Sequence, residues 1–379
     1  MNTQSFTRQL AAIFILVMVM AAQGGCARDA KTAAQKPATK REHAGWRDPR
    51  WIGYVRSAGE ILVIPEMLVD VDLVNRLGIK PLFRIDALSG NITKVPDSGV
   101  TGDAAISDAR GEVLHSLMGY ESHNYSLGTY RPETGKVVAL PSKPGGYFGF
   151  VISPKGDRVA AYFITPEERN RMLKWQFDRM AKKPTIKPPQ IRIDAVLIDL
   201  AKRKVSFTGI QGVPLCWSVD GQTACFRTVK GTLGYNVASG KKTTISPRMD
   251  VGYAKWSAPL NGYVALVFRK GKLVLDLTDQ IFTTKRTLGD CPRNGANLIM
   301  SPGGTKIAYC NEDAYFIFTL EDGTLSQLKG QTGDLDPAWL DEDSLIIGDS
   351  TGEINVVNID GSTEKTYHIA ALKRKPKAN

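Results

Sequence analysis

Short apolar or alternating runs, each bounded by Gly, Pro, Asp or Asn, recur along the chain from about residue 50 to residue 370. Alternation with a period of two predicts β-strands, and the bounding residues predict turns. The runs fall into groups of four. The last group shows this most clearly, with PAWL (337–340), SLIIGD (344–349), EINVVNID (353–360) and EKTYHI (364–369). The pattern therefore predicts an all-β chain built from four-stranded units.

Seven such groups follow one another. Their first strands begin near Arg50, Asp103, Phe148, Leu215, Ala254, Asn297 and Pro337. The three shortest intervals between these starts are 39, 40 and 43 residues, close to the roughly 40–45 residues of a WD-type propeller blade. A four-stranded sheet has two faces to cover, and blades packed around an axis cover both. We therefore predict a seven-bladed β-propeller of four-stranded antiparallel blades over residues 50–370.

Two segments share nearly the same sequence pattern, FVISPKGDRVAAY (150–162) and LIMSPGGTKIAYC (298–310). Each copy has an apolar run, Ser-Pro, a glycine-bearing turn and a second apolar run, which is typical of a tight hairpin. With SVDG at 218–221, these motifs resemble those of the TolB-type, WD-repeat-like propeller family. The usual aspartate of that family's Ser-Pro-Asp-Gly is replaced by Lys155 and by Gly303. The resemblance implies the propeller fold, in a family that includes periplasmic scaffolds and propeller domains beside peptidases.

The N-terminal region is predicted to direct export. Residues 10–22 are all apolar and end before Gln-Gly-Gly-Cys, which fits a secretory signal better than a membrane span of about 20 residues. The small residues before Cys26 resemble a bacterial lipobox, so we expect a signal sequence at 1–25, lipidation of Cys26 and a place at the periplasmic face of a membrane or in the periplasm. Ordinary cleavage nearby, or an uncleaved anchor, is the alternative. Residues 26–49 are expected to form a flexible tether, and 371–379 a basic tail.

Export would place the remaining four cysteines in an oxidising compartment. Cys216 and Cys225 flank the turn SVDGQT at equal distances, so they would face each other across a hairpin. We predict disulfides Cys216–Cys225 and, by subtraction, Cys291–Cys310, with free buried thiols as the alternative.

Charge and motifs exclude several kinds of site. The formal net charge is +11, which favours anionic partners. The scattered histidines and the cysteine spacing do not match a zinc site, and no Gly-x-Ser-x-Gly elbow or phosphate-binding loop is present. We therefore predict no catalytic residues, no cofactor and no metal. We also expect no nucleic-acid partner, and a monomer.

Two insertions interrupt the repeat, at 66–79 in blade one and at 165–190 in blade three. The second begins as a helix, with Thr165 as N-cap, Pro166 at the first helical position and two glutamates in the first turn. One helical stripe contains Leu173, Phe177 and Met180, and it is expected to dock on the propeller.

Trp175 lies off that stripe, among basic residues. We predict a partner-binding surface there, made of Arg171, Lys174, Trp175, Arg179 and Lys182, because Trp and Arg are enriched at binding hot spots. The alternative is that the arginine stems simply pack on Trp175 at the rim.

Three functions remain open on this basis. The main prediction is a non-catalytic cell-envelope platform that binds envelope proteins, acidic ones among them, and is held to the membrane by its N-terminal lipid anchor. The alternative is a propeller enzyme, or a sensor, that binds a small sugar-like ligand in the central channel. The first strands read as apolar or small and offer no converging carboxylates, which favours the platform.

Overall fold

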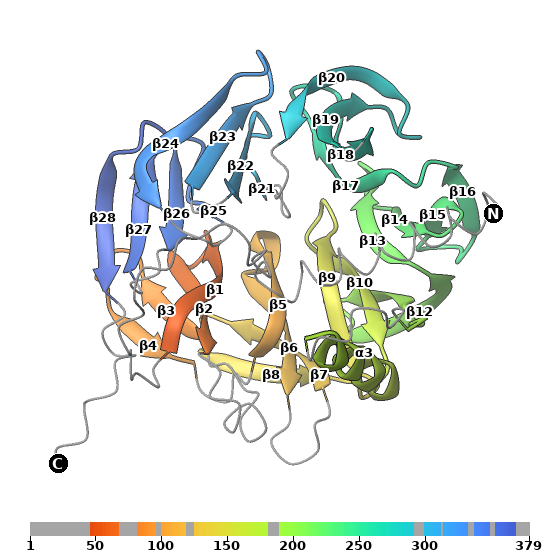
Figure 1. Cartoon of the computed structure of the whole chain (residues 1–379). Helices are drawn as coiled ribbons and strands as arrows, with labels where there is room; N and C mark the ends of the chain where they lie inside the picture. Colours follow the sequence, from red (N-terminus) through yellow and green to blue (C-terminus); the bar gives the residue numbers. More distant parts are fainter. Residues whose placement is uncertain are drawn as a thin grey trace.

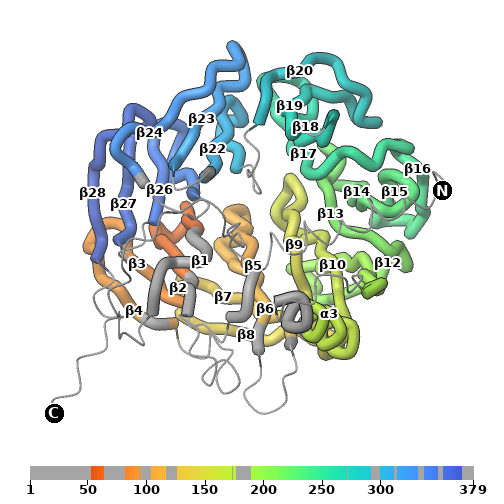
Figure 2. Tube along the Cα trace, viewed as in Figure 1, coloured from red at the N-terminus to blue at the C-terminus, as the bar shows by residue number. Residues whose placement is uncertain are grey.

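The computed structural model describes residues 46–67, 82–95, 100–118, 125–180, 189–270, 272–291, 299–311, 314–332, 337–348 and 353–368. They form seven four-stranded sheets, which stand around a common axis (Figure 1). Within each sheet the strands lie side by side in sequence order, and the chain passes through the blades one after another (Figure 2). The predicted seven-bladed propeller is confirmed.

The strands of the first four blades have the following bounds. Blade one contains β1 Trp46–Val55, β2 Glu60–Met67, β3 Phe83–Asp86 and β4 Ile92–Lys94, and blade two contains β5 Val100–Ser107, β6 Glu112–Met118, β7 Tyr125–Arg131 and β8 Lys136–Leu140, with a short 3-10 helix at Asp108–Arg110. Blade three contains β9 Gly146–Ile152, β10 Arg158–Ile164, β11 Asp194–Asp199 and β12 Lys204–Gln211, and blade four contains β13 Val213–Trp217, β14 Thr223–Thr228, β15 Gly231–Asn236 and β16 Lys242–Ser246.

The last three blades follow the same plan. Blade five contains β17 Val251–Ser257, β18 Gly262–Arg269, β19 Lys272–Thr278 and β20 Thr284–Cys291. Blade six contains β21 Ile299–Met300, β22 Lys306–Asn311, β23 Ala314–Thr319 and β24 Leu325–Thr332, and blade seven contains β25 Ala338–Trp339, β26 Ser344–Gly348, β27 Glu353–Asn358 and β28 Thr363–His368.

The repeated Ser-Pro-x-Gly motif forms the first hairpin of a blade. In blade six the Ser301 amide donates to the carbonyl of Lys306 at 2.9 Å, and the Gly304 amide donates to the carbonyl of Ser301 at 3.0 Å. Gly304 has a φ of +72°, and Gly156 in blade three has +68°, a conformation that glycine adopts without steric cost. The glycines of this motif therefore serve the turn, as predicted.

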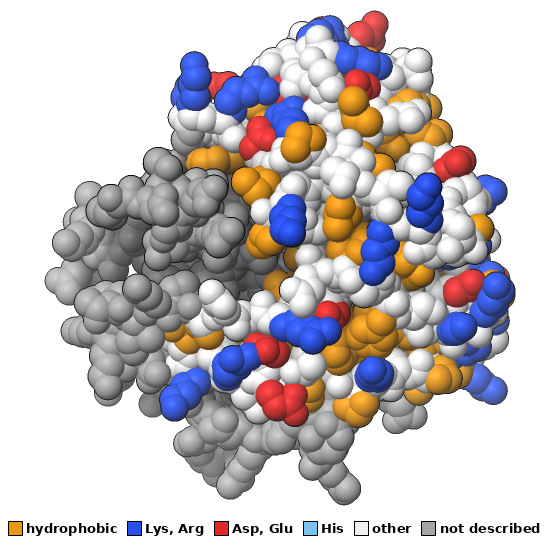
Figure 3. All heavy atoms as spheres, turned by 90° about the vertical axis from the view of Figure 1, so that its right-hand side faces the viewer, with side chains coloured by type: hydrophobic (Ala, Val, Ile, Leu, Met, Phe, Trp, Pro, Cys, Tyr) orange, Lys and Arg blue, Asp and Glu red, His pale blue; other side chains and the backbone are white. Residues whose placement is uncertain are grey.

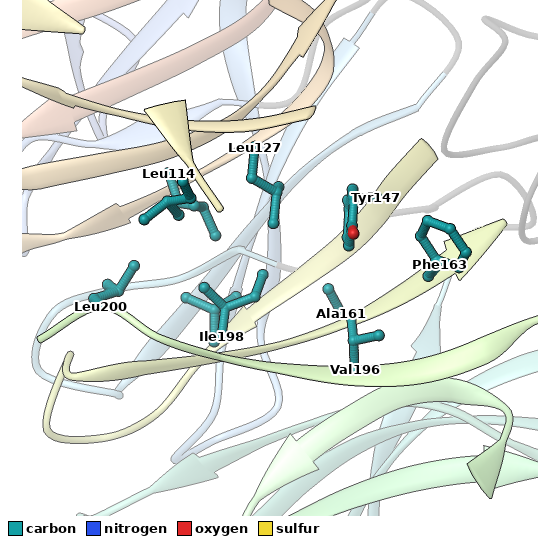
Figure 4. Close-up of a cluster of buried hydrophobic side chains, with 10 residues drawn as sticks. Leu114, Leu127, Tyr147, Ala161, Phe163, Val196, Ile198 and Leu200 are labelled. Carbon is teal, nitrogen blue, oxygen red and sulfur yellow. The ribbon is translucent and has the colours of Figure 1, made fainter. Parts of the chain in front are cut away.

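Apolar side chains fill the space between neighbouring blades. Between blades two and three, Leu114 and Leu127 meet Tyr147, Phe163 and Ile198 (Figure 4). Alternate residues of a strand point to opposite faces of the sheet, so each blade contributes one set of side chains to each neighbour. Fully burying one such side chain stabilises the fold by roughly 1.5–3 kcal/mol, and this packing is what keeps the blades in a ring.

The ring is closed by contacts between blades one and seven, without an exchanged strand. All four strands of blade one come from one end of the chain and all four of blade seven from the other. Ile61 and Ile85 pack with Ile346 in a shared core. The Tyr367 hydroxyl also donates to the carbonyl of Ala87 at 2.7 Å.

The insertion in blade three contains the predicted helix, α3 Pro166–Met180. The Glu168 amide donates to the Thr165 hydroxyl at 3.3 Å, which confirms Thr165 as the N-cap. The prediction that Trp175 lies in a partner-binding surface, away from the docked face of the helix, was wrong. Trp175 is only 6% exposed and packs with Met172 on Tyr162 and Ile164 of the blade. Met172 and Trp175 are three residues apart and so share one helix face, and the apolar surface of blade three covers that face. The side chains of the predicted stripe lie outside the described residues.

The four cysteines among the described residues, Cys216, Cys225, Cys291 and Cys310, form no disulfide. Cys216 and Cys225 lie opposite each other in the register of β13 and β14, as predicted, but form no disulfide. Cys291 packs in the core between blades five and six, whereas Cys310 packs against the core between blades six and seven. Because these two thiols lie on opposite sides of blade six, the predicted Cys291–Cys310 pairing is wrong.

No helix within the described ranges is both long and apolar enough to cross a membrane. Residues 1–45, and with them the predicted signal sequence and Cys26, lie outside the described residues.

Candidate functional site

One face of the ring carries the turns between the first and second strands of the blades, and we call it the first-turn face. Side chains near this face bond to the backbone of neighbouring blades. Ser107 Oγ donates to the Gly156 carbonyl at 2.6 Å, and Ser257 Oγ donates to the Gly304 carbonyl at 2.7 Å. Trp339 Nε1 donates to the Ile299 carbonyl at 2.7 Å. These bonds hold the first turns in fixed positions around the axis.

Arg56 is the first residue after β1 and connects three blades on this face. Its backbone amide donates to Asp108 Oδ1 at 3.1 Å, and its guanidinium donates to Asp108 Oδ2 at 2.8 Å. The other terminal nitrogen donates to the Trp339 carbonyl at 3.1 Å. Its charged group is therefore held in place between blades seven, one and two. A guanidinium keeps its positive charge at all relevant pH values.

Lys255 lies on β17, the strand of blade five that is closest to the axis. Its side chain has accessible surface, yet desolvation by the surrounding protein lowers the pKa of its ammonium, and the positive charge of Arg56 lowers that pKa further. Blades one and five are not neighbours in the ring (Figure 1), so the charge of Arg56 acts on Lys255 from across the axis. Among the described residues, the Lys255 ammonium has no ion-pair partner.

Tyr54 completes this region, on β1 two residues before Arg56. Desolvation raises the pKa of its hydroxyl, the charge of Arg56 opposes this rise, and Asp108 and Asp341 add to it. We call Tyr54, Arg56, Asp108, Lys255 and Asp341 the axial site. Asp108 already neutralises Arg56, so Lys255 is the positive charge that remains available to an anion.

A separate hollow of about 640 Å³ lies beside the start of α3. It is lined by Lys143, Pro144, Phe163, Thr165, Pro166, Glu167, Arg192, Asp194, Phe207 and Gly209. Its charged groups already have partners. Arg192 Nε lies 3.0 Å from Asp194, and the Lys143 ammonium lies 4.6 Å from the centre of the Phe207 ring. An anionic ligand would have to compete with these contacts, which makes the hollow the weaker candidate for such a ligand.

The predicted partner-binding residues do not come together as one exposed surface. Arg171 is exposed but forms an ion pair with Glu168 one turn earlier. Lys174 is exposed, whereas Trp175 is buried against blade three. The side chain of Arg179 and all of Lys182 lie outside the described residues. With its tryptophan buried, the expected hot spot loses the residue on which it depended.

The axial cations were missed because the first strands were interpreted as uniformly apolar or small. Lys255 stands in the run AKWSA and Arg56 directly follows WIGYV. A charged residue in or beside the innermost strand of a blade was the available signal, since that strand is the one that lies next to the axis (Figure 1).

Metal binding has no geometric support in the part of the chain that the structure describes. There, no three side chains among His, Cys, Asp and Glu gather where they could hold an ion.

Among the comparisons with known proteins, solved structures show similarity to this chain, and that similarity concerns the fold. No family model matches the sequence, and no curated protein matches it. An oligogalacturonate lyase in complex with manganese is 12% identical, with a TM-score of 0.57 over 79% of this chain and 86% of the lyase. A second oligogalacturonate lyase, from Vibrio parahaemolyticus, is 10% identical, with a TM-score of 0.55 over 80% of this chain and 87% of that one. These similarities show the β-propeller fold.

Two further structures are less informative. A prolyl endopeptidase is 12% identical, with a TM-score of 0.53. The match covers 96% of this chain but only 54% of the endopeptidase, so this chain spans about half of that protein. TolB from Acinetobacter baumannii is 13% identical with a TM-score of 0.46 over 86% of this chain and 93% of TolB, which is too low to support the specific TolB-type repeat family.

These comparisons contradict the prediction of a non-catalytic, protein-binding platform. The solved propellers with the higher similarity are enzymes, two of them acting on an oligosaccharide. The expectation failed because it rested on first strands without charge, whereas Lys255 and Arg56 place charge at the axis.

Proposed function

We propose that this protein is a propeller that binds a small acidic, sugar-like molecule at the axial site. The observation that carries the proposal is Lys255, a cation on an innermost strand, without an ion-pair partner among the described residues and close enough to Arg56 to feel its charge.

Physical chemistry favours an anion at this position. Two positive charges that approach each other in a partly desolvated place raise the free energy of the charged state. A carboxylate between them would relieve this repulsion and accept charge-assisted hydrogen bonds, which are about twice as strong as neutral ones. The Tyr54 hydroxyl keeps its proton because its pKa is raised, so it can donate to a sugar hydroxyl or carboxylate.

The neighbours support an acidic sugar in particular. Oligogalacturonate, the substrate in the names of two similar propellers, is a sugar chain with one carboxylate on each ring. The carboxylate fits Lys255, whose charge no described residue compensates, and the hydroxyl groups fit the polar turns of the first-turn face. Because the lowered pKa of Lys255 moves it towards neutrality, this residue is also the best placed to exchange a proton with a bound ligand.

Titration calorimetry with trigalacturonate tests the proposal. We expect Lys255→Gln to weaken binding at least tenfold, since a charged hydrogen bond contributes about 1.5–3 kcal/mol, and Lys174→Gln on α3 to leave it unchanged. Neutral galactotriose should bind far more weakly than trigalacturonate. Equal affinity of wild type and Lys255→Gln, or equal binding of the neutral sugar, would contradict the proposal. Ultraviolet absorbance of an unsaturated uronate product in the same mixture distinguishes an enzyme from a sensor.

We also propose that the chain is exported and that Cys26 carries a lipid. This rests on residues 10–26 of the sequence alone. Intact-mass measurement of the protein purified from a bacterial envelope is expected to show loss of residues 1–25 and the added mass of the lipid. A mass that fits cleavage without lipid would contradict lipidation.

A further inference from the structure

The face opposite the first-turn face carries the turns between second and third strands and the connections from one blade to the next. Two such turns, the one at 228–231 in blade four and the one that includes Lys270 in blade five, lie against the connection 246–250. Gly231 lies directly against this connection, because an added Cβ would come within 2.8 Å of Pro247 Cα. The Phe268 amide donates to the Asp250 carbonyl at 2.9 Å. The three segments therefore form one continuous surface.

This surface exposes three large apolar side chains. Val229 is 60% exposed, Phe268 is 42% exposed and Met249 is 36% exposed. Scattered single apolar residues are normal on protein surfaces, but several on adjoining segments mark an interaction site. Figure 3 shows hydrophobic and basic side chains interspersed over the side of the molecule that carries blade four.

Two lysines stand beside these apolar residues at the tips of the turns. Lys230 and Lys270 are exposed, and neither forms an ion pair among the described residues. The other charges nearby are already paired. Arg248 makes two bonds to Asp250, at 2.9 and 2.7 Å, and Lys272 lies 3.4 Å from Asp290. The uncompensated charge of the surface is therefore positive.

The start of the propeller lies on the same face. β1 runs from Trp46 to the first turn at 56–59, so Trp46 is at the end of the strand that points to the opposite face. The 45 residues before it, which include the apolar run 10–22, join the ring from there. The segment that contains this apolar run therefore attaches to the ring on this face.

We propose that Val229, Lys230, Met249, Phe268 and Lys270, which we call the basic-apolar patch, dock on a membrane surface that contains anionic lipid. Apolar side chains enter the headgroup region while lysines attract anionic headgroups. One weak membrane signal gives only reversible binding, and a second makes the attachment stable. The patch would thus add to whatever attachment the N-terminal segment provides, and would turn the first-turn face away from the membrane.

Vesicle flotation of the full chain tests this. The probes are vesicles of phosphatidylcholine alone and vesicles with added phosphatidylglycerol. We expect wild type to prefer the anionic vesicles, and Lys230→Glu/Phe268→Ser to lower that partition at least tenfold. A matched control on the first-turn face, Lys155→Glu/Val219→Ser, should behave like wild type, and the N-terminal segment is the same in all three.

Lys230→Glu/Lys270→Glu provides a second variant that leaves all apolar packing intact, so a folding defect cannot mimic the result. It should also bind anionic vesicles at least tenfold less, and circular dichroism should show an unchanged fold. Wild-type affinity in either patch variant would overturn the proposal, as would equal binding of wild type to neutral and anionic vesicles. Capture of an acidic protein without any vesicle binding would overturn it too.

Discussion

The two faces of the ring are built from different kinds of sequence. The first-turn face comes from the part that repeats, and its side chains bond to a neighbouring blade, as Ser107, Ser257 and Trp339 do. The opposite face carries what does not repeat, including α3 and the basic-apolar patch. A repeated motif gives a rigid frame, and the residues that depart from it give each face its chemistry: Lys255 at the axis, and Phe268 with Lys230 on the far side.

The strongest test of the opposite face is Trp175→Ala. Trp175 anchors α3 on blade three, and truncation of a buried tryptophan costs roughly 3–5 kcal/mol. We expect α3 to detach and amide exchange within 166–180 to accelerate at least a hundredfold, while the blades stay folded. The exposed neighbour Lys174→Ala should keep wild-type exchange. Equal exchange in Trp175→Ala and wild type would show that the helix is held by other contacts.

Acid should weaken both faces together through His115. This histidine of β6 is fully buried, and burial lowers its pKa from 6.5 to about 4. The unfolded chain binds a proton below pH 6.5 and the folded chain does not until about pH 4. The free energy of unfolding therefore falls as the pH drops through this window, by about 3 kcal/mol.

The variant His115→Gln cannot titrate and should lose this slope between pH 6.5 and 5 in urea unfolding, where carboxylates contribute less. A wild-type slope in the variant would assign the acid sensitivity to other groups. Separate transitions for the two faces would contradict a single cooperative ring.

The first-turn face can be weakened selectively at Glu342. Its carboxylate accepts hydrogen bonds from Ser301 Oγ and from the Gly303 amide, both at 2.7 Å, and from Thr305. These bonds lower its pKa against the opposing effect of desolvation. Glu342→Gln should reduce the free energy of unfolding by about 2 kcal/mol at pH 7.

That stabilisation depends on the charged carboxylate, so it is present above the ordinary pKa of 4.5 and disappears as the pH falls through the lowered value. Urea unfolding of Glu342→Gln beside Glu321→Gln, which changes an exposed glutamate of blade six, measures the difference. Equal stability of the two variants would mean that Glu342 does not hold blades six and seven together.

Ring closure gives the smallest expected effect. Tyr367→Phe removes the hydroxyl that bonds blade seven to Ala87 of blade one, and we expect a loss of about 1 kcal/mol. Tyr315→Phe removes a similar bond between blades six and seven, from its hydroxyl to the Gly348 carbonyl at 2.9 Å, and should cost the same. A much larger loss of stability in Tyr367→Phe than in Tyr315→Phe under thermal unfolding would show that the contact that closes the ring contributes more than an ordinary contact between blades.

Most of the fold could be predicted from local patterns. Strand alternation, the spacing of repeats and the glycine turns depend on neighbours in sequence, and they gave seven blades, the cap at Thr165 and the register of Cys216 with Cys225. Trp175 shows the limit of prediction from local patterns. Helical periodicity offers more than one stripe, and the surface of blade three decides which one docks.

The candidate site could not be predicted in the same way. Arg56 and Lys255 come from blades one and five, almost two hundred residues apart, and only the closed ring brings their charges into range of each other. Each residue alone resembles an ordinary charge at the end of a strand. The predicted disulfide between Cys291 and Cys310 was wrong for a related reason. The alternation of side chains along β22 points Cys310 away from Cys291.

The central claim is that an acidic sugar binds at the axis on the first-turn face. Hydrogen–deuterium exchange with and without saturating trigalacturonate tests it most directly. We expect slower exchange in β17 at 251–257 and in the turn at 56–59, with no change around the hollow beside α3. Protection at 143–145 and 165–167 instead, or no protection near the axis when the ligand is bound, would contradict it.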